Sequence, residues 1–183
     1  MPADKLSQSD VARLLSDPTP VNRAETAAKV AGAFNPRRLT DSERALAEEI
    51  FRLMVKDAEV RVRQALTENL KQNGNVPHDV AVALANDVDQ VALPMIEFSK
   101  VLNDDDLIAI VGSQNPAKQE AAAGRAHVSE ALSEALVETG NEAAVTRLVA
   151  NEGAKISEQT FQKVVDDFGD RSGVQSAMVN RSS

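Results

Sequence analysis

The segment Leu66-Thr67-Glu68-Asn69 has three counterparts further along the chain, namely Ile96-Glu97-Phe98-Ser99, Ala122-Ala123-Gly124-Arg125 and Leu148-Val149-Ala150-Asn151. Each begins with an apolar or small residue and ends with a polar one, and the successive spacings are 30, 26 and 26 residues. A second landmark, an aliphatic residue followed by a residue that suits a helix start, recurs at Val76-Pro77, Leu102-Asn103, Val128-Ser129 and Ile156-Ser157. Its spacings of 26, 26 and 28 residues nearly match the first set, so the two landmarks indicate one internal repeat.

The segments between these landmarks have the pattern of helices. Apolar residues recur three and four positions apart, as at Leu132 and Leu136, and Ala, Glu, Leu and Gln are frequent. Thr40-Asp41-Ser42-Glu43 fits a capping box, and Ser7–Asp10 and Asn103–Asp106 resemble one. Turn-forming pairs divide the chain at Asp17-Pro18, Asn35-Pro36, Asn73-Gly74, Asn115-Pro116, Gly140-Asn141 and Gly169-Asp170. We therefore expect an all-α protein of about twelve short helices.

A repeat of this length holds one helical hairpin, which cannot bury its apolar face alone and must stack on its neighbours. The expected fold is a HEAT-like α-solenoid that forms a single repeat domain over residues 1–183. Its parts are an N-terminal capping helix over 1–19, an irregular first hairpin over 20–56, regular repeats over 57–169, and the start of a further repeat or a C-terminal cap over 170–183. Pro94, inside a first helix, predicts the kink that is common in HEAT-type units.

The charge distribution limits the kinds of partner. The net charge is -8, and residues 1–72 carry +1 whereas residues 73–183 carry -9. Duplex DNA and anionic lipid both rely on basic patches, so we expect neither as the main partner. The chain has no Trp or Tyr and only five Phe, which leaves little material for base stacking or an aromatic ligand pocket.

The cellular compartment follows from similar arguments. Absence of cysteine excludes disulfides, a thiol nucleophile and thiolate metal sites, and agrees with a reducing compartment. The first residues lack the apolar core of a signal peptide, and no run approaches the roughly 18 apolar residues of a membrane span. We expect a cytoplasmic protein.

Short motifs with a chemical meaning have simpler structural explanations here. Asp167-Phe168-Gly169 matches a kinase tripeptide, but the other kinase motifs are missing, and Phe168 is expected to close the core face of a helix that Gly169 ends. Asp104-Asp105-Asp106 lacks the spacing of a calcium loop and suits a helix start. His78 and His127 belong to no zinc-like set. We expect no enzymatic activity and no catalytic, cofactor-binding or metal-binding residues.

Two sets of polar residues can be interpreted either as binding residues or as structural ones. Asn69, Arg125 and Asn151 share one repeat position and could line a ligand-binding ridge. However, Asn suits the left-handed residue that ends a helix, and Arg can bond the last carbonyls. A basic patch is conceivable from Arg37, Arg38, Arg44, Arg52, Arg61 and Arg63, but Glu43, Glu48, Glu49, Asp57 and Glu59 lie close enough along the chain to pair with most of them.

The ordered motifs resemble a bacterial family known as domain of unknown function 2336. The resemblance rests on Asp57–Leu70, Val76-Pro77-His78-Asp79-Val80, Val101–Leu107 and Ala150–Ser157, and it covers roughly residues 20–170. It implies a HEAT-like helical repeat fold and no assigned activity.

We expect a non-enzymatic scaffold that binds another protein along its second helices, because stacked hairpins create an extended groove there. Their outward positions should include Asp105, Glu130, Glu134, Gln159 and Lys163. Between these should lie the buried Leu107, Leu132, Leu136, Phe161 and Val165. Acids outnumber bases, so the expected partner is a positively charged protein segment, for example a helix. One alternative is that these acids only keep the protein soluble. Another is that the chain is a nucleic-acid-binding or DNA-repair module or a bilin-lyase-like protein, since such proteins reuse this helical architecture.

Overall fold

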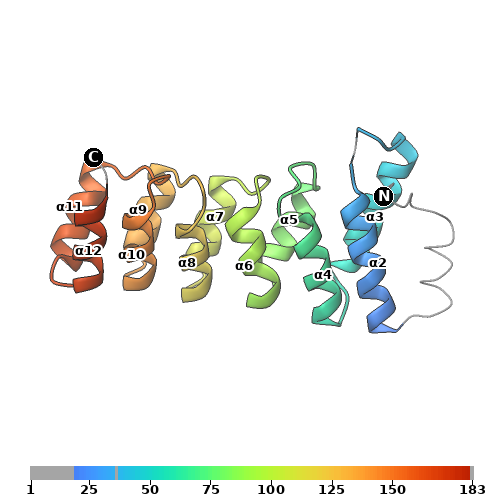
Figure 1. The fold of residues 1–183 in the computed structure, drawn as a ribbon, viewed down its shortest axis with the longest axis horizontal. Helices are drawn as coiled ribbons and strands as arrows, with labels where there is room; N and C mark the ends of the chain where they lie inside the picture. Colours follow the sequence, from blue (N-terminus) through green and yellow to red (C-terminus); the bar gives the residue numbers. More distant parts are fainter. Residues whose placement is uncertain (1–18, 36, 182–183) are drawn as a thin grey trace. The chain divides into compact units, whose positions relative to one another are not determined.

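The computed structural model describes residues 19–35 and 37–181, and within these ranges every regular element is an α-helix (Figure 1). This confirms the all-α prediction. The helices are α2 (Pro20–Ala33), α3 (Asp41–Met54), α4 (Val60–Leu70), α5 (His78–Ala85), α6 (Asp89–Phe98), α7 (Asp104–Val111), α8 (Pro116–Ala123), α9 (Glu130–Glu138), α10 (Glu142–Ala150), α11 (Glu158–Phe168) and α12 (Ser172–Asn180). The expected N-terminal capping helix and the Ser7–Asp10 box lie outside the described residues. None of the helices described is long and apolar enough to cross a bilayer.

The second helices of the repeat begin where the sequence predicts them. Helices α5, α7, α9 and α11 start at residues 78, 104, 130 and 158. Asn103, Ser129 and Ser157 are the N-cap residues of the last three, and their side chains accept hydrogen bonds from backbone amides of the first turn. Each landmark aliphatic residue lies just before its cap, and Leu102 and Val128 are buried there. The repeat period is therefore the period of capped helix starts.

Other helix boundaries follow the predicted caps and turns. The Thr40–Glu43 and Asn103–Asp106 capping boxes are both formed, with each side chain bonded to the other residue's backbone. Asn115 caps α8 ahead of Pro116, whose missing N–H costs nothing at the first helical position. Gly140, between α9 and α10, has φ +72°, a left-handed conformation that glycine adopts without strain.

The chain divides into two compact units near the end of α6. Of the described residues, the first unit contains those up to Met95 together with Ser99–Val101, and the second contains Ile96–Phe98 together with those from Leu102 onward. In the first unit α2 packs on α4, and the rings of Phe34 and Phe51 meet edge to face with centroids 5.0 Å apart. That the whole chain forms one repeat domain stays a prediction.

In the second unit alternate helices pack on one another. Helix α10 lies between α8 and α12, and α9 lies between α7 and α11, so the first and second helices of the repeat form two layers (Figure 1). Leu132 and Leu136 of α9 and Leu148 of α10 are fully buried between them. This is the stacked-hairpin packing that the repeat predicts, and it places α7, α9 and α11 in one layer.

Candidate functional site

The five residues predicted to face outward lie on the second helices of the second unit, and all five are exposed. Asp105 belongs to α7, Glu130 and Glu134 to α9, and Gln159 and Lys163 to α11. Their buried neighbours were predicted correctly on α7 and α9, where Leu107, Leu132 and Leu136 are in the core. The orientation of these two helices is therefore confirmed, whereas a role in binding is not tested by exposure.

The predicted register of α11 was wrong. Val165 is 41% exposed and Phe161 is only half-buried, whereas Thr160, Val164 and Phe168 form the buried stripe. Thr160 can occupy the core because its hydroxyl accepts a hydrogen bond from Ser157 Oγ at 2.9 Å. Gln159 and Lys163 are exposed as predicted, so the error concerns the buried face of this helix.

The structure brings three of the five predicted residues together in one hollow. Glu134, Gln159 and Lys163 line an open depression of about 560 Å³ between α9 and α11, which we call the α9–α11 hollow. Its other lining residues are Glu138, Thr160, Gln162, Asp166 and Asp167. Asp105 and Glu130 line neither this hollow nor the second one described below.

The α9–α11 hollow is strongly acidic. Its four carboxylates, which belong to Glu134, Glu138, Asp166 and Asp167, face one ammonium, so three negative charges remain uncompensated within it. That ammonium, Lys163 Nζ, lies 2.7 Å from Asp167 Oδ2. The hydrogen bond and charge of Asp167 raise the pKa of Lys163, and the charges of Glu138 and Asp166 add to the effect. The hollow therefore already holds one cation of the chain itself.

Sequence reasoning missed three of these carboxylates. Glu138 lies four residues after Glu134, and Asp167 lies four residues after Lys163, so helical spacing alone places each pair on one face. Asp166 accepts a hydrogen bond from Gln162 Nε2 at 2.9 Å over the same interval. The i,i+4 spacing from the predicted Glu134 and Lys163 was therefore a signal that could have identified Glu138 and Asp167.

A second hollow, of about 770 Å³, lies between α7 and α9 and the turns that follow them. We call it the α7–α9 hollow. Its lining includes the apolar Ile108, Val111 and Ala135 together with Gln114, Gln119 and Glu138. Glu138 lines both hollows, so they adjoin across α9.

Hydrogen bonds fix the shape of the α7–α9 hollow. The buried Gln119 donates from Nε2 to the Val111 carbonyl at 3.0 Å, and its Oε1 accepts from Asn141 Nδ2 at 2.9 Å. Asn141 Oδ1 also caps α10 by accepting from the Ala143 and Ala144 amides. Because both amide side chains are committed to the fold, the apolar lining is held in a preformed arrangement.

The repeat position shared by Asn69, Arg125 and Asn151 has a structural role. Asn151 donates from Nδ2 to the carbonyls of Ala123 and Arg125 at 2.8 and 2.7 Å, which ties the end of α10 to the end of α8. Arg125 reaches back to the Ile96 carbonyl of α6 in the same way, and Asn69 bonds within α4. The expectation of a left-handed asparagine was wrong, since Asn151 has φ -84°. Arg125 and Asn151 therefore link neighbouring repeats, whereas the hydrogen bond that Asn69 donates stays within its own helix, and these bonds are structural ones.

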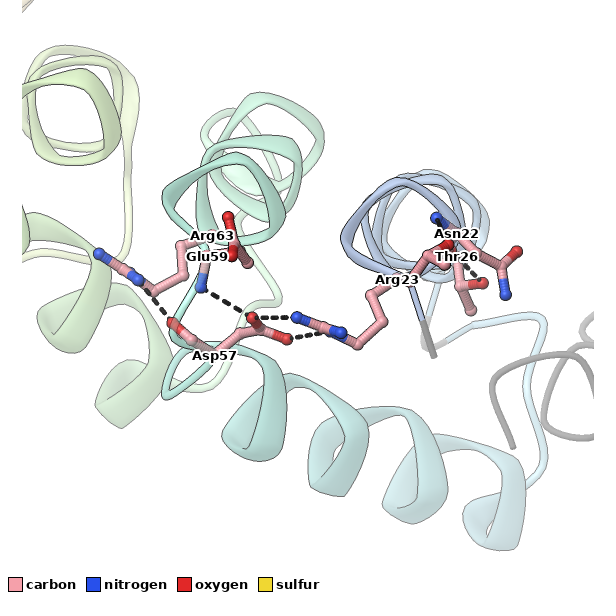
Figure 2. Close-up of polar contacts among 7 residues, drawn as sticks. Asn22, Arg23, Thr26, Asp57, Glu59 and Arg63 are labelled. Carbon is pink, nitrogen blue, oxygen red and sulfur yellow. Dashed lines mark hydrogen bonds and ion pairs between the residues drawn. The ribbon is translucent and has the colours of Figure 1, made fainter. Parts of the chain in front are cut away.

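Ion pairs between described residues engage three of the six arginines that could have formed a basic patch, namely Arg44, Arg52 and Arg63. Arg52 Nε lies 2.8 Å from Asp79 Oδ2, and Arg63 donates to both carboxylate oxygens of Asp87. Arg63 also donates to the Asp57 carbonyl (Figure 2). Arg44 pairs with Asp41. Glu48, whose Oε2 lies 3.6 Å from Arg52 Nη2, is one of the partners expected along the chain. Asp79 of α5 and Asp87 ahead of α6 were not expected, because they lie close to these arginines only in the folded stack.

The acidic triplet and the kinase-like tripeptide have the expected structural roles. Asp106 completes the α7 capping box, and Phe168 is buried one residue before the C-cap Gly169. Within residues 19–35 and 37–181, no three His, Cys, Asp or Glu side chains are grouped closely enough to hold a metal ion.

Comparison with known proteins gives a family but no function. A family model described as "Uncharacterised protein conserved in bacteria (DUF2336)" matches residues 91–183. No curated protein and no solved structure matches the chain. The matched residues include both hollows, whereas the Asp57–Leu70 run that contributed to the resemblance lies before them.

Proposed function

The chain belongs to the uncharacterised bacterial family DUF2336, and from this premise we propose that it is a non-catalytic, cytoplasmic module that binds a positively charged segment of another protein. The α9–α11 hollow is the proposed contact surface. The observation that carries the proposal is the convergence of Glu134, Glu138, Asp166 and Asp167 around a single lysine in an open depression.

The surroundings of this hollow suit binding without a change of fold. Helix α9 is anchored by the fully buried Leu132 and Leu136, and Ser133 Oγ donates to the Lys155 carbonyl ahead of α11 at 2.8 Å. The two helices that carry the carboxylates are thus linked by packing and by a hydrogen bond. A surface that is already arranged loses less entropy when it binds.

The charges disfavour the nucleic-acid alternative. Phosphate would be repelled by the three uncompensated negative charges of the hollow, and Arg44, Arg52 and Arg63 are engaged in ion pairs. A filter-binding assay with DNA at low salt tests this point directly. Clear binding with a steep salt dependence would support the alternative and count against the proposal.

Affinity capture from the native bacterial lysate, read by quantitative mass spectrometry, tests the proposed function. The bait is the full chain, compared with Glu134→Lys/Glu138→Lys and with the control Glu48→Lys/Glu49→Lys, whose positions line neither hollow. We expect proteins that are captured by the unmodified chain and by the control but lost from the α9 variant. Equal capture by all three baits, with unchanged helical circular dichroism, would exclude this hollow as the contact surface.

A further inference from the structure

The two hollows of the second unit adjoin at one residue but differ in chemistry. Glu138 lines both. On one side of it, every residue that lines the α9–α11 hollow is polar or charged. On the other side, Ile108, Val111 and Ala135 contribute apolar surface to the α7–α9 hollow. A ligand that extends across α9 would therefore meet a cation-attracting surface and then a surface of mixed lining, with apolar atoms from Ile108, Val111 and Ala135 beside polar side chains.

The apolar side is formed and partly open before any ligand arrives. Val111 is buried, whereas Ile108 and Ala135 are each half-buried, so the latter two keep apolar atoms exposed in the lining of the depression. An aliphatic side chain placed there would lose water-exposed apolar area.

The rim of the α7–α9 hollow carries a strained residue. Gln114 has φ +61°, the left-handed region that non-glycine residues adopt at a cost, and among the described residues no other non-glycine residue does so. Gln114 lies next to Asn115, the N-cap of α8, and its backbone sets the turn that borders the α7–α9 hollow.

We propose that the partner segment is bipartite, with a lysine or arginine side chain in the α9–α11 hollow and an aliphatic side chain of the same segment in the α7–α9 hollow. This inference rests on the proposed function and specifies the chemistry of the partner. Charge complementarity selects the first side chain, because three negative charges of the first hollow are uncompensated. Burial of apolar surface selects the second. Because Glu138 lines both hollows, one short segment can reach both of them.

Selection from a displayed library of random dodecapeptides against the immobilised full chain tests the inference. We expect enriched peptides to share a Lys or Arg and an aliphatic residue at a constant separation. The affinity of a selected peptide is then measured for the Ala135→Phe variant, in which the larger side chain fills the α7–α9 hollow. The matched control is Ala109→Phe, at an exposed alanine of α7 outside both hollows. Affinity should fall by at least about tenfold for the first variant and stay within about twofold for the second.

The possible outcomes separate the two proposals. Enriched peptides that keep a basic residue but show no aliphatic preference, or an Ala135→Phe variant that binds as well as the control, would overturn the bipartite segment and leave the proposed function standing. Peptide pools without a basic preference, or without enrichment over a selection that omits the protein, would overturn both. Thermal melts of the two alanine variants show whether either has lost the fold.

Discussion

Asp57 accepts two parallel hydrogen bonds from the guanidinium of Arg23, with Nε at 2.7 Å from Oδ2 and Nη2 at 3.0 Å from Oδ1 (Figure 2). The pair joins α2 to the turn that precedes α4. Asp57 Oδ1 also accepts from the Glu59 amide at 2.9 Å. The hydrogen bond from Arg23 lowers the pKa of Asp57, and the Glu59 amide and the charges of Arg23 and Arg63 act in the same direction.

This pair predicts a specific pH dependence of stability. The folded pKa of Asp57 is below its unfolded value of about 3.9, so the stabilisation is complete above that value and is lost as the pH falls through the folded pKa. Asp57→Asn should therefore be less stable than the unmodified chain at pH 7, and the difference should shrink below about pH 4. Urea unfolding of both proteins at several pH values measures this, and a constant difference down to pH 3 would contradict it.

The packing of α9 predicts unequal costs for buried and exposed substitutions on the same helix. Leu132→Ala or Leu136→Ala removes a fully buried side chain and should lower the free energy of unfolding by about 2–5 kcal/mol. Glu134→Ala changes an exposed position of the same helix and should cost less than about 0.5 kcal/mol. Chemical denaturation of the three variants provides the comparison. Similar small losses in all of them would mean that this face of α9 is not packed.

A close approach between two loops makes Gly153 sensitive to a single methyl group. A Cβ added there would lie 2.0 Å from the Ala126 carbonyl oxygen, which belongs to the backbone and cannot swing aside. Gly153→Ala should therefore destabilise the protein by about 1–3 kcal/mol. Gly74→Ala is the control, because its Cβ would meet nothing within 4 Å. Thermal unfolding that shows equal midpoints for both variants would argue against this contact.

The repeat and its helix starts could be predicted because they depend on local signals. Asn103, Ser129 and Ser157 begin helices through hydrogen bonds that span three residues, and such bonds leave a pattern at a fixed period. The register of α11 could not be predicted in the same way. Val164 and Phe168 form an apolar pair four residues apart, and so do Phe161 and Val165. Packing within the unit decides which of the two apolar pairs is buried. Thr160 can be buried beside Val164 because its hydroxyl accepts a hydrogen bond from Ser157.

Contacts between repeats were also beyond sequence reasoning. Asn151 bonds to carbonyls 26 and 28 residues earlier, and Arg63 pairs with Asp87 on the following hairpin. Such partners depend on how one repeat lies against the next. The outward direction of Glu134 and Lys163 follows from helical periodicity and was predictable. Their meeting in one hollow depends on how α9 packs against α11 and was not.

The lysine of the α9–α11 hollow should oppose an incoming cation. Lys163→Gln removes its charge and frees Asp167 to meet the partner, so association with a captured basic partner should be faster by about two- to fivefold at low salt. The pair is exposed, and its loss should change stability little. Lys155→Gln, at an exposed position that lines neither hollow, is the control. Stopped-flow or surface plasmon resonance rates that are equal for the two variants would show that Lys163 does not compete.

The association rate of a captured partner as a function of salt concentration, measured by surface plasmon resonance, tests the central claim most directly. The proteins compared are the unmodified chain, Glu134→Lys/Glu138→Lys and Glu48→Lys/Glu49→Lys. An acidic contact surface predicts a rate that falls as salt increases for the unmodified chain and the control. For the α9 variant it predicts a slower rate with a weaker salt dependence. An α9 variant whose rate and salt dependence match those of the unmodified chain would contradict the claim that the α9–α11 hollow binds a positively charged protein segment.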